Sequence, residues 1–142
     1  MNRIIAICLV LFVNQLFANQ IPTIYGIWMS EEMDYSIEVY PSGPQLLAKI
    51  HWVNTQKVLS VLDVYNSDPA LRSRPLTGLI IWRDFRMDNN GKKWKSGRIY
   101  NFHNGNYYNA RLSLTDDGRL ELYGFWWFLS MFGKSKYFIK VQ

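Results

Sequence analysis

The chain has 142 residues, of which 49% are hydrophobic, 16% are aromatic and 19% are charged, and its formal net charge is +5. This composition supplies enough apolar side chains for a packed core and excludes a disordered, collagen-like or coiled-coil chain. The length is too short for two ordinary domains, so we expect a single folded unit.

Residues 1–18 are typical of a secretory signal peptide. Arg3 gives a positive start, an unbroken apolar run follows at positions 4–13, and Ala18 offers a small residue for cleavage. A membrane-spanning helix needs roughly 17 to 25 apolar residues, so this run is too short to be one. The sequence therefore predicts a periplasmic or secreted protein.

The mature chain, residues 19–142, would contain no thiol, because the single cysteine, Cys8, lies in the predicted leader. Disulfides, thiolate metal ligands and a cysteine nucleophile are thereby excluded from it. We expect one domain over 19–142 that is held together by core packing alone.

Apolar and polar residues alternate with a period of two along this domain, which is typical of strands with one face on a core. We predict eight strands, at Ile24–Ser30, Tyr35–Tyr40, Leu46–Val53, Leu79–Met87, Lys93–Asn101, Tyr107–Leu114, Arg119–Phe125 and Lys136–Val141. Hairpin turns with glycine are predicted at Pro41–Pro44, Asp88–Gly91, His103–Asn106 and Thr115–Gly118. Eight antiparallel strands with short turns favour an all-β, up-and-down barrel, which leaves no exposed sheet edge.

An outer-membrane barrel is the alternative architecture for eight strands behind a signal peptide. Its strands need about 9 to 11 residues with a continuous apolar outer band. The predicted strands are mostly shorter, and one face of most of them carries Lys, Arg, Glu or Asn. The pattern therefore favours a barrel that is not embedded in a membrane.

The triplet Gly26-Ile27-Trp28 opens the first predicted strand. A glycine and tryptophan at this place in an exported eight-stranded barrel resemble the lipocalin signature, in which the tryptophan closes one end of the barrel under a basic residue of the last strand. Lys136 or Lys140 would take that position here, through a cation–π contact worth about 0.5–2 kcal/mol.

The run from Asp63 to Leu79 has the form D-x-x-N-x-D-P-x-L-R-x-R-P-L-x-G-L. It resembles the hallmark of an uncharacterised family of small exported bacterial proteins, catalogued as a domain of unknown function and similar in fold to lipocalins. The chain departs from the family pattern at Tyr65 and at Asn101-Phe102. The resemblance implies a lipocalin-like (calycin) barrel and export, but it implies no reaction and no ligand.

The same run carries a cluster of carboxylate, amide and guanidinium groups, at Asp63, Asn66, Asp68, Arg72 and Arg74. One interpretation is a polar mouth that binds an anionic head group through bidentate arginines. The other, which we favour, is a strap whose charges pair with one another. A calcium site is a third interpretation, but a bidentate glutamate and a central glycine are missing.

Large aromatic side chains exceed what a core of this size requires, which indicates a ligand cavity. The predicted ligand-binding residues are Trp52, Trp82, Phe85, Tyr100, Tyr108, Trp126 and Phe128. The segment 126–132 is apolar and uncharged, so we expect it to fold inward as a lid with Trp126 facing the interior. The alternative to a ligand cavity is a solidly packed core, and the alternative to a lid is a dimer interface.

We therefore predict a lipocalin-like protein that binds a small hydrophobic or amphipathic ligand, such as a fatty acid, as a monomer or weak homodimer. No nucleic acid partner, cofactor or metal is expected. Enzymatic activity is not expected either, because the only histidines are His51 and His103 and no catalytic motif is present. An envelope hydrolase using two carboxylates, such as Asp63 and Asp68, stays a third hypothesis.

A second candidate function comes from charge. Six basic residues and two acidic ones give +4 within positions 83–98: Arg83, Arg86, Lys92, Lys93, Lys95 and Arg98 against Asp84 and Asp88. This strand pair would present one basic surface to anionic components of the cell envelope, with the barrel as a scaffold.

Overall fold

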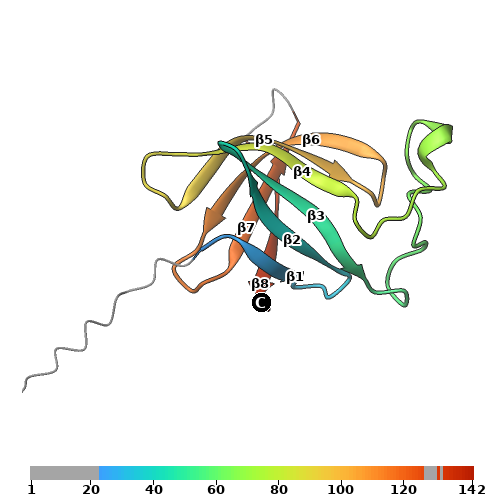
Figure 1. Cartoon of the computed structure of the whole chain (residues 1–142), viewed down its shortest axis with the longest axis horizontal. Coiled ribbons are helices and arrows are strands. Elements are labelled where there is room, and N and C mark those ends of the chain that lie inside the picture. Colours follow the sequence, from blue (N-terminus) through green and yellow to red (C-terminus); the bar gives the residue numbers. More distant parts are fainter. Residues whose placement is uncertain (1–22, 127–130, 132) are drawn as a thin grey trace, which may run out of the picture.

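The computed structural model describes residues 23–126, 131 and 133–142, and it consists of eight antiparallel strands that close into a barrel (Figure 1). The strands are β1 (Gly26–Ser30), β2 (Tyr35–Ser42), β3 (Gln45–Val53), β4 (Ile80–Met87), β5 (Lys93–Asn101), β6 (Asn106–Leu114), β7 (Leu120–Phe125) and β8 (Lys134–Lys140). Each strand pairs with its neighbour in the chain, and β8 pairs with β1 to close the barrel. The predicted up-and-down barrel is therefore confirmed, whereas the predicted signal peptide lies outside the described residues.

The connections divide between the two ends of the barrel. At one end, which we call the Trp28 end, lie the turns β2–β3, β4–β5 and β6–β7. At the other, which we call the Asp34 end, lie the connections β1–β2, β3–β4, β5–β6 and β7–β8. The connection between β3 and β4 contains the 3-10 turn η1 (Pro69–Leu71). Among the described residues, no helix is long and apolar enough to cross a membrane.

Aromatic side chains fill the middle of the barrel. Trp82 and Phe138 are fully buried and meet edge to face, with ring centroids 5.3 Å apart. Phe85 packs against Gly97, where an added Cβ would lie only 2.0 Å from a carbon of the phenyl ring. Gly97 thus leaves room for the ring of Phe85, which is fully buried in the core.

Trp28 and Lys140 form a contact at the Trp28 end. The indole Nε1 donates to the carbonyl oxygen of Ile24 at 2.8 Å, and the ammonium of Lys140 lies 5.6 Å from the indole centroid. The same ammonium donates to the carbonyl oxygen of Thr23 at 2.8 Å. Of the two lysines considered from the sequence, Lys140 therefore covers the tryptophan.

The long connection between β3 and β4 lies beside the barrel and not across its interior (Figure 1, green). Its two arms pair through a bridge between Leu62 and Pro75, so residues 61–76 form a narrow ribbon, which we call the strap. The strap packs on the β5–β6 turn, where an added Cβ at Gly105 would meet the carbonyl oxygen of Tyr65 at 1.8 Å.

Candidate functional site

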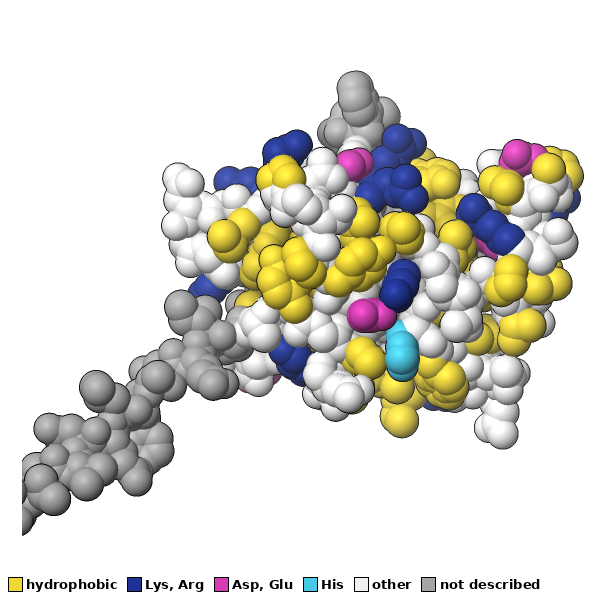
Figure 2. Space-filling view, viewed as in Figure 1, with side chains coloured by type: hydrophobic (Ala, Val, Ile, Leu, Met, Phe, Trp, Pro, Cys, Tyr) yellow, Lys and Arg dark blue, Asp and Glu magenta, His cyan; other side chains and the backbone are white. Residues whose placement is uncertain are grey.

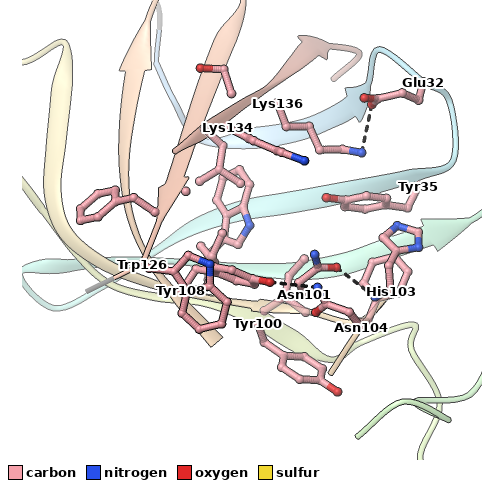
Figure 3. Close-up of a pocket in the computed structure, with 18 residues that line it drawn as sticks. Glu32, Tyr35, Tyr100, Asn101, His103, Asn104, Tyr108, Trp126, Lys134 and Lys136 are labelled. Carbon is pink, nitrogen blue, oxygen red and sulfur yellow. Dashed lines mark hydrogen bonds and ion pairs between the residues drawn. The ribbon is translucent and has the colours of Figure 1, made fainter. Parts of the chain in front are cut away.

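A cavity of about 460 Å³ opens at the Asp34 end (Figure 3). Its volume lies within the roughly 300–1,000 Å³ typical of small-molecule sites. Apolar side chains form its wall, from Ile81, Trp82, Ile99, Leu122 and Phe125. Polar side chains of two strands, β5 and β8, and of two turns form much of its rim: Glu32, Asn101, His103, Asn104, Lys134 and Lys136.

Packing and backbone register set the depth and the width of this cavity. Phe138, Lys136 and Lys134 follow one another at two-residue steps along β8, so they share one face, about 7 Å apart per step. Phe138 and Trp82 close the floor, and Lys134 lies nearest the opening. Lys134 pairs with Gly124 of β7, which has no side chain to narrow the cavity there.

Asp34 organises the rim next to the cavity. Its carboxylate accepts hydrogen bonds from the hydroxyl of Ser30 and from the backbone N–H of Tyr35. It also lies 3.2 Å from Nε2 of His103 and 3.4 Å from the ammonium of Lys136. Glu32 contacts the same ammonium at 2.9 Å, so Lys136 is held at the cavity edge by two carboxylates.

The pKa of Asp34 lies well below its usual range. Burial of the carboxyl alone would raise the pKa, but the hydrogen bonds from His103 and Ser30 and the charge of Lys136 outweigh it. Asp34 is therefore ionised at neutral pH, and its carboxylate interacts with Ser30, His103 and Lys136.

Several hydrogen-bond donors of the cavity have no acceptor within the described part of the chain. Among them are the hydroxyl of Tyr35 and the ammonium of Lys134, and Figure 3 shows the hydroxyl and both lysine side chains directed at the same region. Burial, followed by the negative charges of Asp34 and Glu32, raises the pKa of Tyr35, so its hydroxyl stays protonated at neutral pH. The cavity therefore offers neutral donors and a cationic donor to a polar group.

Four of the aromatic residues predicted to bind ligand line this cavity: Trp82, Tyr100, Tyr108 and Trp126. Tyr108 and Trp126 meet edge to face at 4.9 Å, and the phenol oxygen of Tyr108 accepts from Nδ2 of Asn104 at 2.9 Å. Trp126 is 53% exposed, so it forms the edge of the cavity and not its floor.

The structure places the other predicted ligand residues elsewhere. Trp52 is 43% exposed and does not line the cavity, because the β2–β3 register shifts between Ser36 and Ile37 and turns Val53 inward in its place. Phe85 is buried below the floor and lines a smaller cavity of about 360 Å³ at the Trp28 end. Phe128, on which part of the lid prediction depends, lies outside the described residues.

Tyr100 borders the cavity as well, but its phenol group has another partner. Its side chain points away from the interior in Figure 3, and its hydroxyl donates to Asp63 of the strap at 2.6 Å. Burial, then the hydrogen bond to Asp63, raises the pKa of Tyr100. The side chain therefore anchors the strap to the outside of β5.

The polar cluster of the strap pairs internally. Asp63 is fully buried and accepts from Nδ2 of Asn66 at 2.8 Å and from two guanidinium nitrogens of Arg74 at 2.9 Å. Nε of Arg72 donates to the carbonyl oxygen of Asn66 at 2.7 Å, and Asp68 caps η1 through the backbone N–H of Ala70. None of these five predicted residues lines the 460 Å³ cavity, so the contacts match the strap and not the polar mouth.

Sequence reasoning missed Tyr35, Asp34 and Lys134 as site residues. The available signal was the alternation along the last strand, in which Lys134 and Lys136 share a face with Phe138. The prediction began that strand at Lys136 and so left out Lys134. In the described part of the chain, no group of three or more His, Cys, Asp or Glu side chains is arranged to hold a metal ion.

Comparisons with known proteins agree with this architecture. The profile of a family described as "Uncharacterized protein conserved in bacteria (DUF2147)" matches residues 26–140. Among solved structures, the chain is similar to protein HP1028 from Helicobacter pylori, described as belonging to the lipocalin family, with a TM-score of 0.72, 21% identity and 84% coverage of each chain. No curated protein matches the sequence.

The matched range runs from the first residue of β1 to the last residue of β8. The chain therefore belongs to the DUF2147 family, and its fold is that of a lipocalin-like barrel.

Proposed function

We propose that this protein binds a small amphipathic molecule with an acidic head group, such as a medium-chain fatty acid, in the cavity at the Asp34 end. The observation that carries the proposal is the placement of the Tyr35 hydroxyl and the Lys134 ammonium, which have no acceptor among the described residues, above an apolar wall. Tyr35 is buried, so a hydroxyl without an acceptor costs free energy there, which an acceptor on a bound ligand would remove; Lys134 is exposed at the opening and adds a positive charge for an acidic head group.

The shape of the cavity supports this orientation of the ligand. The alkyl chain would contact Ile99, Leu122 and the Trp82 floor, whereas the carboxylate would lie at Lys134 near the opening. Because Trp82 and Phe138 fill the middle of the barrel, a chain of moderate length fits better than a long one. The lipocalin-like fold supports a small-ligand role, since eight-stranded barrels have room for one small molecule.

We propose a binding role and not catalysis. The Asp34 carboxylate is directed at Ser30, His103 and Lys136, and the Asp63 carboxylate is buried in the strap, so neither is free to act on a ligand. The signal-peptide pattern of residues 1–18 supports action outside the cytoplasm.

Titration of tryptophan fluorescence with decanoate and with decanol tests the proposal, because Trp82 and Trp126 line the cavity. We expect both compounds to change the fluorescence. Lys134→Met should weaken the binding of decanoate by about tenfold, or 1.4 kcal/mol, and should change the binding of decanol little. Lys49→Met is the matched control, since Lys49 lies outside the cavity and pairs with Glu38.

A response to neither compound would contradict a ligand-binding cavity. Equal binding of decanoate to the wild type and to Lys134→Met would instead contradict the assignment of the head group while leaving an apolar site. Gly124→Leu, which fills the cavity wall beside Ile99, should reduce the binding of both compounds.

A further inference from the structure

The outer wall formed by β4, β5 and β6 is unusually basic. These strands contain six basic residues, which we call the basic wall: Arg83, Arg86, Lys93, Lys95, Arg98 and Arg111. The one acidic residue in the three strands is Asp84. All six basic side chains are exposed, and in the view of Figure 2 several Lys and Arg side chains line the upper edge, where Figure 1 places these strands.

The strand register places like charges opposite each other. Arg83 pairs with Arg98 and Arg86 pairs with Lys95 across β4 and β5. Direct cross-strand pairs of like charge are destabilising, so folding stability does not account for this arrangement.

Several cations elsewhere in the molecule pair with carboxylates, whereas those of the basic wall do not. Lys49 pairs with Glu38 at 3.2 Å, and Arg119 pairs with both Glu31 and Asp117. Among the described residues, no carboxylate lies within 4.0 Å of any charged nitrogen of the basic wall. An external anion is therefore the available partner.

We propose that the basic wall docks the protein on a bilayer that contains anionic phospholipid. The cations are spread over three neighbouring strands on the outside of a barrel, which suits a two-dimensional array of phosphates better than one narrow ligand. The guanidiniums of Arg98 and Arg111 lie over the rings of Tyr107 and Tyr123, at 4.9 and 4.4 Å. Tyrosine beside arginine is an amphipathic combination favoured at membrane–water interfaces.

The inner faces of the same strands contribute Trp82, Ile99 and Tyr108 to the cavity. A docked basic wall would therefore hold the cavity close to the lipid surface. The docking proposal does not depend on the identity of the cavity ligand, and the two are tested separately.

Co-sedimentation with vesicles tests the docking. The protein is purified as the expressing cell accumulates it. It is then mixed with phosphatidylcholine vesicles that either contain or lack phosphatidylglycerol. We expect binding that requires phosphatidylglycerol and weakens steeply between about 50 and 500 mM salt, where the Debye length shortens. The double variant Arg86→Glu, Lys95→Glu should lose more than tenfold in affinity, since each basic residue near such a surface contributes about fivefold.

The double variant Lys49→Glu, Lys57→Glu is the matched control, because it changes the net charge equally on other parts of the molecule. It should retain more of the vesicle binding than the basic-wall variant, and both should keep the wild-type circular dichroism spectrum. Equal losses in the two variants, or binding that is the same without phosphatidylglycerol, would overturn the proposal. Binding to dextran sulfate without binding to anionic vesicles would also overturn it, in favour of a polymeric partner.

Discussion

The two ends of the barrel use lysine side chains from the same face of β8 in different ways. At the Trp28 end, Lys140 lies over a buried indole and donates to a backbone carbonyl. At the Asp34 end, Lys136 is held by two carboxylates, and Lys134 faces the cavity without a partner among the described residues. The Trp28 end therefore uses a lysine to complete packing, whereas the Asp34 end keeps a lysine ammonium available to a ligand.

Tryptophan follows the same division. Trp28 is 1% exposed and hydrogen bonded, whereas Trp126 is 53% exposed and contacts Tyr108 at the cavity edge. A buried ring with a satisfied N–H contributes to folding, and an exposed ring above an apolar cavity is available to a ligand. We infer that stability is concentrated toward the Trp28 end and binding toward the Asp34 end.

The largest expected effect distinguishes the two tryptophans. Trp28→Ala should reduce the free energy of unfolding by about 3–5 kcal/mol, because it leaves a cavity in the core. Trp126→Ala should reduce it by less than about 1 kcal/mol, as is usual at exposed positions, while weakening ligand binding. Urea denaturation of both variants measures the difference, and equal losses would remove the distinction between the ends.

A smaller effect is expected from the carboxylate of the rim. Because the pKa of Asp34 is lowered from its ordinary value of 3.8, its stabilising contribution is present at neutral pH and is lost as the pH falls below about 4. The wild type should therefore lose stability more steeply below pH 4 than Asp34→Asn does. At neutral pH the variant should be about 1–3 kcal/mol less stable, since Lys136 and His103 lose a charged partner. If the wild type and Asp34→Asn lose the same stability as the pH falls, this role of Asp34 is contradicted.

The smallest expected effect compares the lysines themselves. Lys140→Met should cost about 0.5–1 kcal/mol, the contribution of a cation–π contact at a partly exposed site. Lys134→Met should leave the stability of the ligand-free protein unchanged, because its ammonium forms no hydrogen bond or ion pair with a described residue. Thermal unfolding of the two variants makes the comparison, and a greater loss in Lys134→Met would show that Lys134 has a structural role.

Much of the fold followed from local patterns. Strand alternation and glycine-containing turns placed all eight strands, because each hairpin depends on residues close in the chain. Register shifts were not predictable, since they depend on how neighbouring strands fit. Trp52 is the clearest case, where one extra residue in β3 turns a tryptophan from the interior to the surface.

The candidate site was harder to predict than the fold. Asp34 and His103 come from turns 69 positions apart, and only closure of the barrel brings them to 3.2 Å. Tyr100 looked like a cavity residue, but the strap supplies Asp63 as its partner on the other side of the sheet. Such contacts between distant segments leave no periodic signal in the sequence.

Methyl NMR during titration with decanoate tests the division of the barrel most directly. We expect the methyl resonances of Ile81, Ile99 and Leu122, which line the cavity at the Asp34 end, to shift with ligand concentration. Those of Ile24 and Leu46, which line the smaller cavity at the Trp28 end, should stay in place. Shifts confined to Ile24 and Leu46, or shifts of equal size at both ends, would contradict the assignment of binding to the Asp34 end.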